Sequence, residues 1–143
     1  MIRLQPYIQL YLRLALAAGY LKLGFDRLGL WGPYGKPFVS WGDWKHFMEY
    51  AGQVMGFLPA GLVEVLAVTA TVAEILFGIL LLAGKWTRAA ATGSGILTLM
   101  FAIAMAVSNG VQDPIGYSVF TVSAASFLLA TLPSYKWSMD NLK

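Results

Sequence analysis

The chain contains no cysteine among its 143 residues, and this absence excludes several kinds of chemistry. Disulfide exchange, iron–sulfur clusters, thiolate-bound zinc and c-type haem attachment all require cysteine. Histidine is almost as scarce, because His46 is the only one. A single chain therefore has no pair of histidines to hold a haem from both sides. Any redox role needs a bound diffusible cofactor or a partner subunit.

Charged residues are also few. They make up 12% of the chain, whereas a soluble domain usually carries about 25%. Hydrophobic residues make up 58%, so much of the surface must face something other than water. The net charge is +3, but the Lys and Arg residues are scattered singly at the ends of apolar runs. Without a basic stripe, this pattern argues against nucleic-acid binding.

Four apolar stretches are long enough to cross a membrane as helices, which takes roughly 20 residues each. They cover residues 7–25, 60–83, 89–107 and 115–132. Strands are not expected, because no ten-residue alternating segments separated by turns are visible. The sequence therefore predicts an all-α fold, an integral membrane four-helix bundle that forms one domain over residues 1–143.

The short connections between these stretches predict the orientation, because basic residues favour the cytoplasmic side. Basic residues precede the first stretch, separate the second from the third and follow the fourth: Arg3, Lys85, Arg88, Lys136 and Lys143. The connection at 108–114 contains none. Both termini are therefore expected in the cytoplasm.

The outer segment between the first two stretches, about residues 29–58, is rich in aromatic side chains. They are Trp31, Tyr34, Phe38, Trp41, Trp44, Phe47, Tyr50 and Phe57. Asp43 is placed to cap a helix that begins near Trp44, and apolar residues follow at helical spacing on one face. The pattern predicts an amphipathic helix on the outer membrane face or over the bundle. A simple aromatic belt at the interface has the same composition, so that interpretation stays open.

Two charged residues, Arg13 and Glu74, lie inside apolar stretches. Each charge costs about 2.5 to 3.5 kcal/mol near a helix centre, so neither should face lipid alone. We therefore expect Arg13 and Glu74 to pair. One interpretation is a structural ion pair that fixes the helix arrangement. The other is a site that handles protons or binds a polar head group inside the bundle.

Two stretches of the sequence resemble a known family. Residues 11–22 resemble the opening span of the DoxX family of small four-helix membrane proteins. Residues 73–91 are similar to the family's most recognisable stretch, in which an acidic residue, two glycines and a basic turn lead into the third helix. In this chain those residues are Glu74, Gly78, Gly84, Thr87 and Arg88. The resemblance covers nearly the whole chain and identifies a single DoxX-like membrane domain.

The resemblance implies a bacterial inner-membrane subunit that helps a redox system reach the quinone pool. Arg13 and Glu74 would then be the polar core. A bound quinone would suit an apolar cleft with a few polar donors at its outer mouth. The candidate donors are Lys22, Asp26, Trp44 and His46. No metal site is expected.

Two other functions remain open at this point. In the first, the chain is a structural or assembly subunit without a ligand. In the second, it is a small carrier for a lipophilic or anionic solute. A carrier favours a helix broken at mid-membrane, and none of the four stretches has an internal proline to indicate one. The expected partners are the lipid bilayer and a soluble or membrane redox protein. A homo-oligomer is also compatible with the sequence.

Overall fold

The computed structural model describes residues 4–142, and within that range the chain is helical and contains no strand. The helices in chain order are α1 (Gln5–Asp26), α2 (Trp44–Val54), α3 (Ala60–Ala83), α4 (Thr87–Asn109), α5 (Gln112–Gly116), α6 (Val119–Thr131) and the 3-10 helix η1 (Met139–Asn141). The all-α prediction is confirmed. Arg3 and Lys143, two of the basic residues behind the predicted orientation, lie outside the described residues.

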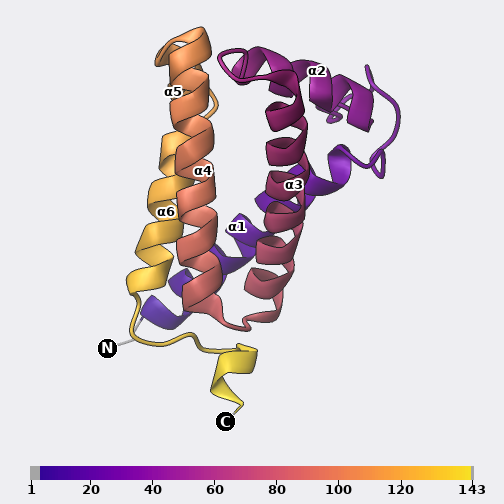
Figure 1. Ribbon diagram of the computed structural model, residues 1–143. Helices are drawn as coiled ribbons and strands as arrows, with labels where there is room; N and C mark the ends of the chain where they lie inside the picture. The colour runs from indigo at the N-terminus through magenta and orange to yellow at the C-terminus, as the bar shows by residue number, and fades with distance from the viewer. Residues whose placement is uncertain (1–3, 143) are drawn as a thin grey trace.

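Four of the helices form the body of the molecule. α3, α4 and α6 stand next to one another, while α1 runs obliquely across them (Figure 1). α1 packs mainly along α3, and α4 packs mainly along α6. α2 and α5 lie at one end, which we call the α2 end. The α3–α4 turn and the C-terminal segment lie at the opposite end, which we call the turn end.

The register between α1 and α3 is set where small residues meet bulky ones. Gly24 lies against Ile75, and Gly78 lies against Leu21, so close that a Cβ at either glycine would collide. The two helices run antiparallel, as these two contacts require. The last residues of α1 therefore lie beside the middle of α3 and do not reach the level of its first residue, Ala60.

Large apolar side chains are exposed along three of the helices. They are Tyr7, Ile8, Tyr11 and Leu14 on α1, Val65, Val68, Val72, Leu76 and Ile79 on α3, and Ile96, Met100, Ile103 and Val107 on α4. The buried faces hold smaller or polar residues such as Ala67, Ala91, Ser94 and Ala102. Judged by length and composition, α3 and α4 are each able to cross a membrane. Small residues inside and apolar residues outside are typical of helices packed in lipid, and this indicates a membrane protein.

The helix limits follow the hydrophobic pattern closely. α3 begins and ends at the predicted residues, 60 and 83. α1 and α4 extend one or two residues beyond the predicted 7–25 and 89–107 at each end. Pro6 lies in the first turn of α1, where its missing N–H has no cost.

α2 forms within the aromatic segment 29–58, beginning at Trp44. The Asp43 carboxylate caps it, accepting the backbone N–H of His46 at 2.8 Å. The predicted cap and helix start are therefore confirmed. The residues of α2 that are buried are Phe47, Ala51 and Val54, and α2 packs with this face on α3 and α4.

The predicted fourth helix, residues 115–132, is wrong in one respect, because the chain forms two helices there. α5 ends at Gly116 and α6 begins at Val119. Between them Ser118 has a left-handed backbone with φ of 58°, which interrupts the helical hydrogen bonds. Glycine is a poor helix former, so a break beside Gly116 costs little. The apolar pattern continues across the break, and periodicity alone therefore did not show it.

The C-terminal segment returns to the turn between α3 and α4. One oxygen of the Asp140 carboxylate accepts the backbone N–H of Trp86 at 2.7 Å, and the other accepts that of Thr87 at 2.8 Å. These N–H groups lie at the start of α4, so Asp140 caps this helix from a distant part of the chain. Burial raises the pKa of Asp140, but the hydrogen bonds from Thr87 and Trp86 outweigh burial and hold that pKa below its usual value.

Replacing Asp140 with Asn should destabilise the protein by about 1 kcal/mol, because the cap loses a charged acceptor. The folded-state pKa of Asp140 is lowered, so its contribution is complete above the usual Asp pKa and disappears as the pH falls through the folded-state value. Thermal unfolding in detergent should show a difference between Asp140→Asn and the wild type at about pH 7 that shrinks as the pH falls below the usual Asp pKa of about 3.9. A difference that is independent of pH would contradict this account of the cap.

Candidate functional site

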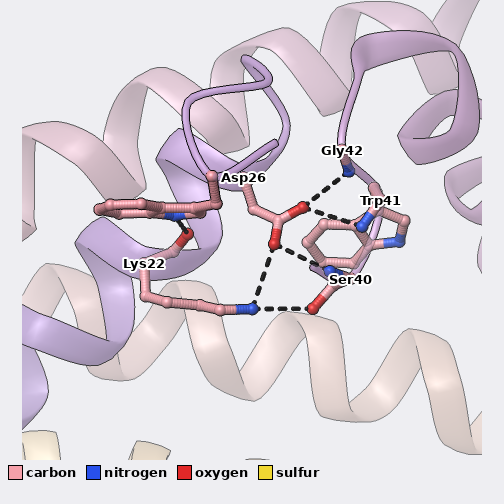
Figure 2. A network of polar contacts seen from close by, with 6 residues as sticks. Lys22, Asp26, Ser40, Trp41 and Gly42 are labelled. Atoms are coloured by element: carbon pink, nitrogen blue, oxygen red, sulfur yellow. Dashed lines mark hydrogen bonds and ion pairs between the residues drawn. The ribbon is translucent and has the colours of Figure 1, made fainter. Parts of the chain in front are cut away.

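Asp26, the last residue of α1, lies at the centre of a polar network (Figure 2). Its side chain is fully buried. One carboxylate oxygen accepts the backbone N–H groups of Trp41 at 2.8 Å and Gly42 at 2.9 Å. The other accepts the Ser40 N–H at 2.9 Å and the Lys22 ammonium at 3.1 Å. A single carboxylate therefore fastens residues 40–42 to the end of α1.

Lys22 lies one helical turn before Asp26 and is partly exposed. Its Nζ donates to Asp26 and also to the Ser40 hydroxyl at 3.0 Å. An ammonium group has three N–H donors, and contacts within residues 4–142 use two of them. One donor therefore remains for a ligand. The backbone carbonyl of Lys22 accepts the Trp31 indole N–H at 2.8 Å, which holds this aromatic ring beside the lysine.

A pocket of about 380 Å³ opens next to this network. It is lined by Lys22, Trp31, Pro37, Phe38 and Val39. Apolar atoms make up most of its wall, and among the lining residues from the described part of the chain Lys22 is the charged one. Phe38 is 92% exposed and has a left-handed backbone with φ of 68°. That conformation costs a non-glycine residue about 1–2 kcal/mol, so the loop holds this exposed ring at a local energetic cost.

A second charged pair lies deeper, between Arg27 and Glu74 on α3. Both side chains are buried, and the Arg27 guanidinium forms an ion pair with the Glu74 carboxylate. Arg27 also donates to the Thr71 hydroxyl at 2.9 Å. The rings of Phe47 and Trp41 cover the guanidinium, with centroids 4.1 and 5.2 Å from its central carbon. Arg27 is thus enclosed by α3 on one side and by aromatic rings on the other.

The predicted pairing of Arg13 with Glu74 is wrong. Arg13 is buried at the turn end, where it donates to the backbone carbonyl of Trp137 at 2.7 Å. The reason is the register between α1 and α3, which places Arg27 beside Glu74 and leaves Arg13 near Gly84. Arg27 lies just beyond the predicted first stretch, residues 7–25, and the sequence therefore did not indicate it as the partner. A signal was present, since Arg13, Tyr20 and Arg27 recur every seven residues on one helix face.

The four candidate donors for a ligand divide into two groups. Lys22 and Asp26 are in contact at the network described above. His46 instead lies against Asp43, with its Nδ1 2.9 and 3.0 Å from the two carboxylate oxygens, and stacks on Tyr34. Hydrogen bonds from the His46 backbone and ring lower the pKa of the exposed Asp43 carboxyl group.

Trp44 packs against Phe47, with the ring centroids 5.3 Å apart. It therefore supports the aromatic cover over Arg27 and lies apart from the pocket wall formed by Lys22. The described part of the chain brings no three His, Asp or Glu side chains together as a metal site. The arrangement suits a lipophilic ligand with a hydrogen-bond acceptor, because apolar walls surround one cationic donor.

Comparison with known proteins identifies one family. The family model described as DoxX matches residues 8–108, which begin within the first turn of α1 and end within the last turn of α4. Neither the curated proteins nor the solved structures gave a match. The match includes the Asp26 network and the Arg27–Glu74 pair, whereas Asp140 and the rest of the C-terminal segment lie beyond it.

Removing only one partner of the buried pair should be far more damaging than removing both. Arg27→Met leaves the Glu74 carboxylate buried without its cation, and this should cost about 3–5 kcal/mol of unfolding free energy. The double variant Arg27→Met, Glu74→Met should recover most of that loss. Unfolding in mixed micelles with increasing denaturing detergent measures the unfolding free energies of the single and the double variant.

The matched control combines Arg13→Met with Glu74→Met. Since Arg13 and Glu74 do not touch, these two effects should add, with a coupling free energy near zero. Strong coupling between Arg13 and Glu74, with none between Arg27 and Glu74, would refute the pairing described above.

Proposed function

Because the chain belongs to the DoxX family, we propose that it is a multi-pass protein of the bacterial inner membrane that binds a quinone and links a redox system to the quinone pool. The observation that carries the ligand assignment is the pocket beside Lys22. It combines apolar and aromatic walls with one cationic donor that has a hydrogen bond left to make. A quinone head group is a flat ring with two carbonyl acceptors, which this combination complements.

In the proposed topology the chain crosses the membrane four times, through α1 together with the loop that follows it, then α3, α4 and the pair α5–α6. The length and composition of α3 and α4 and the exposed apolar side chains on α1 support it. In this orientation the basic turn with Lys85 and Arg88 is cytoplasmic, as are both termini. The α2 end, with Lys22 and the pocket, then faces the outer side of the membrane.

The chain's part in the redox reaction is to bind and orient the quinone. Lys22 donates a hydrogen bond to a quinone carbonyl, while Trp31 and Phe38 contact the ring. The electrons come from a soluble or membrane redox partner, because the cysteine-free chain with a single histidine supplies no cluster and no bis-histidine haem.

A structural or assembly role is the second candidate, and the Arg27–Glu74 pair favours it. This pair is enclosed by Thr71, Phe47 and Trp41, and so its contacts are with other parts of the same chain. A buried pair of this kind specifies which surfaces of two helices meet. A subunit that holds a larger complex together would need such a defined arrangement even without a ligand.

The ligand assignment predicts that quinone copurifies with the protein from its native membrane and depends on Lys22. Lys22→Met should reduce the bound quinone about tenfold, because a charge-assisted hydrogen bond contributes about 1.5–3 kcal/mol. Mass spectrometry of lipid extracts, normalised to protein, measures the quinone. Lys45→Met is the matched control, since Lys45 is an exposed lysine of α2 outside the pocket wall.

A second variant guards against a loss caused by misfolding. Phe38→Gly removes the exposed ring but also relieves the left-handed backbone, so it should stay folded and still bind less quinone. Quinone content equal in the wild type and both pocket variants would contradict the ligand assignment. If no quinone is present but one polypeptide copurifies at constant stoichiometry, the structural role is supported instead.

A further inference from the structure

The depth at which α1 ends is unusual for a membrane helix that leads to an outer loop. Arg27, directly after α1, contacts Thr71 and Glu74 on α3. These two residues lie eleven and fourteen positions after Ala60, or about 16 and 21 Å along the helix at 1.5 Å per residue. The whole of α3 has 24 residues and is about 36 Å long. α1 therefore ends near the middle of α3.

The chain that follows α1 consequently folds beside the half of α3 nearer the α2 end. In Figure 1 the loop between α1 and α2 lies at the height of this half of α3, and α2 lies at the top of the view. If α3 crosses the bilayer, much of residues 27–43 lies at the depth of its outer leaflet. A hydrated connecting loop would instead begin outside the membrane.

Irregular backbone at such a depth requires its polar groups to be satisfied internally. Asp26 does this for three consecutive N–H groups, those of residues 40–42. Tight turns satisfy others: the N–H of Leu30 donates to the carbonyl of Phe25 at 3.2 Å, and that of Val39 donates to Lys36 at 3.2 Å. Most backbone N–H groups of the loop are therefore paired within the chain, whereas no such pair is formed by those of Trp31, Tyr34, Gly35 and Phe38 among the described contacts.

The side chains that this loop exposes suit lipid. Five of them are large and apolar or aromatic, and each is at least half exposed: Leu28, Leu30, Trp31, Tyr34 and Phe38. Between residues 28 and 42 the only charged residue is Lys36. A lysine extends its ammonium to the lipid phosphates while its carbon chain stays in the apolar region. Trp and Tyr favour the same boundary.

We infer that residues 28–39 form a non-helical loop embedded in the outer leaflet, with its exposed apolar side chains against lipid acyl chains and Lys36 at the level of the phosphates. This inference rests on the membrane embedding in the proposed function and is independent of the quinone. It has one consequence for the proposed site. The pocket lined by Lys22, Trp31 and Phe38 opens from this loop, so a ligand enters sideways from the lipid.

The absence of cysteine allows a direct test, because single cysteines can be introduced without a background. Nitroxide spin labels are attached at Phe38→Cys and, separately, Leu30→Cys in the full chain reconstituted in phosphatidylethanolamine and phosphatidylglycerol vesicles. Two references are Val72→Cys, on the exposed apolar face of α3, and Glu49→Cys, on the exposed face of α2. Electron paramagnetic resonance then compares the accessibility of each label to oxygen and to a water-soluble nickel chelate.

The ratio of oxygen to nickel accessibility at residues 30 and 38 should be several-fold above that at 49 and below that at 72, because Val72 lies at the middle of α3 and so nearer the bilayer centre. If the ratios at 30 and 38 match that at Glu49 while Val72 stays oxygen-accessible, the loop is not embedded in the outer leaflet. The crossing by α3 would still stand in that case. Nickel accessibility at Val72 as well would show that α3 does not cross the bilayer, which would refute the proposed topology itself.

Discussion

The arrangement of the α2 end depends on the Asp26 carboxylate. It accepts three backbone N–H groups and the Lys22 ammonium, and so joins the end of α1 to the residues just before α2. A buried donor left without an acceptor costs about 1–3 kcal/mol, so loss of this acid would cost most at Gly42, whose hydrogen bond is buried. Because Trp41 is one of the residues it holds, Asp26 also places a ring over Arg27. The pocket wall, the aromatic cover and the start of α2 share this single point of attachment.

Charge balance explains why these groups lie together. Lys22 with Asp26 and Arg27 with Glu74 form two neutral pairs where α1 ends, so no net charge is placed there. A buried pair contributes little to stability compared with an apolar replacement, because desolvation offsets the attraction. Its larger effect is on specificity, since Arg27 meets Glu74 only in the register that also brings Gly24 to Ile75 and Gly78 to Leu21. Any other register would leave a charge unpaired.

The features that the sequence predicted correctly are those encoded locally. Helix α3 follows from one uninterrupted apolar run, and the Asp43 cap from an acid directly before an amphipathic pattern. The family was also recognisable, because its motif lies within residues 73–91. The partner of Glu74 was not predictable in the same way. Periodicity gives the face of a helix, but the shift of one helix along another depends on which bulky residue meets which glycine, and both sides offered several choices.

Periodicity also could not predict the contacts of Asp140, because its partners lie more than fifty residues away along the chain. In the structure, the two parts of the family motif have different roles. Glu74 is used at mid-height of α3 to fix α1, whereas the basic turn at Gly84 to Arg88 is used ten residues later to receive the C-terminal segment. Arg13, buried at this turn, has a backbone carbonyl as its acceptor, and Asp140 is the carboxylate whose charge acts on it. The segment that carries Asp140 lies beyond the family match. The backbone carbonyl of Trp137, which accepts from this buried arginine, also lies outside the matched region, so the two ends of the molecule are stabilised by different parts of the chain.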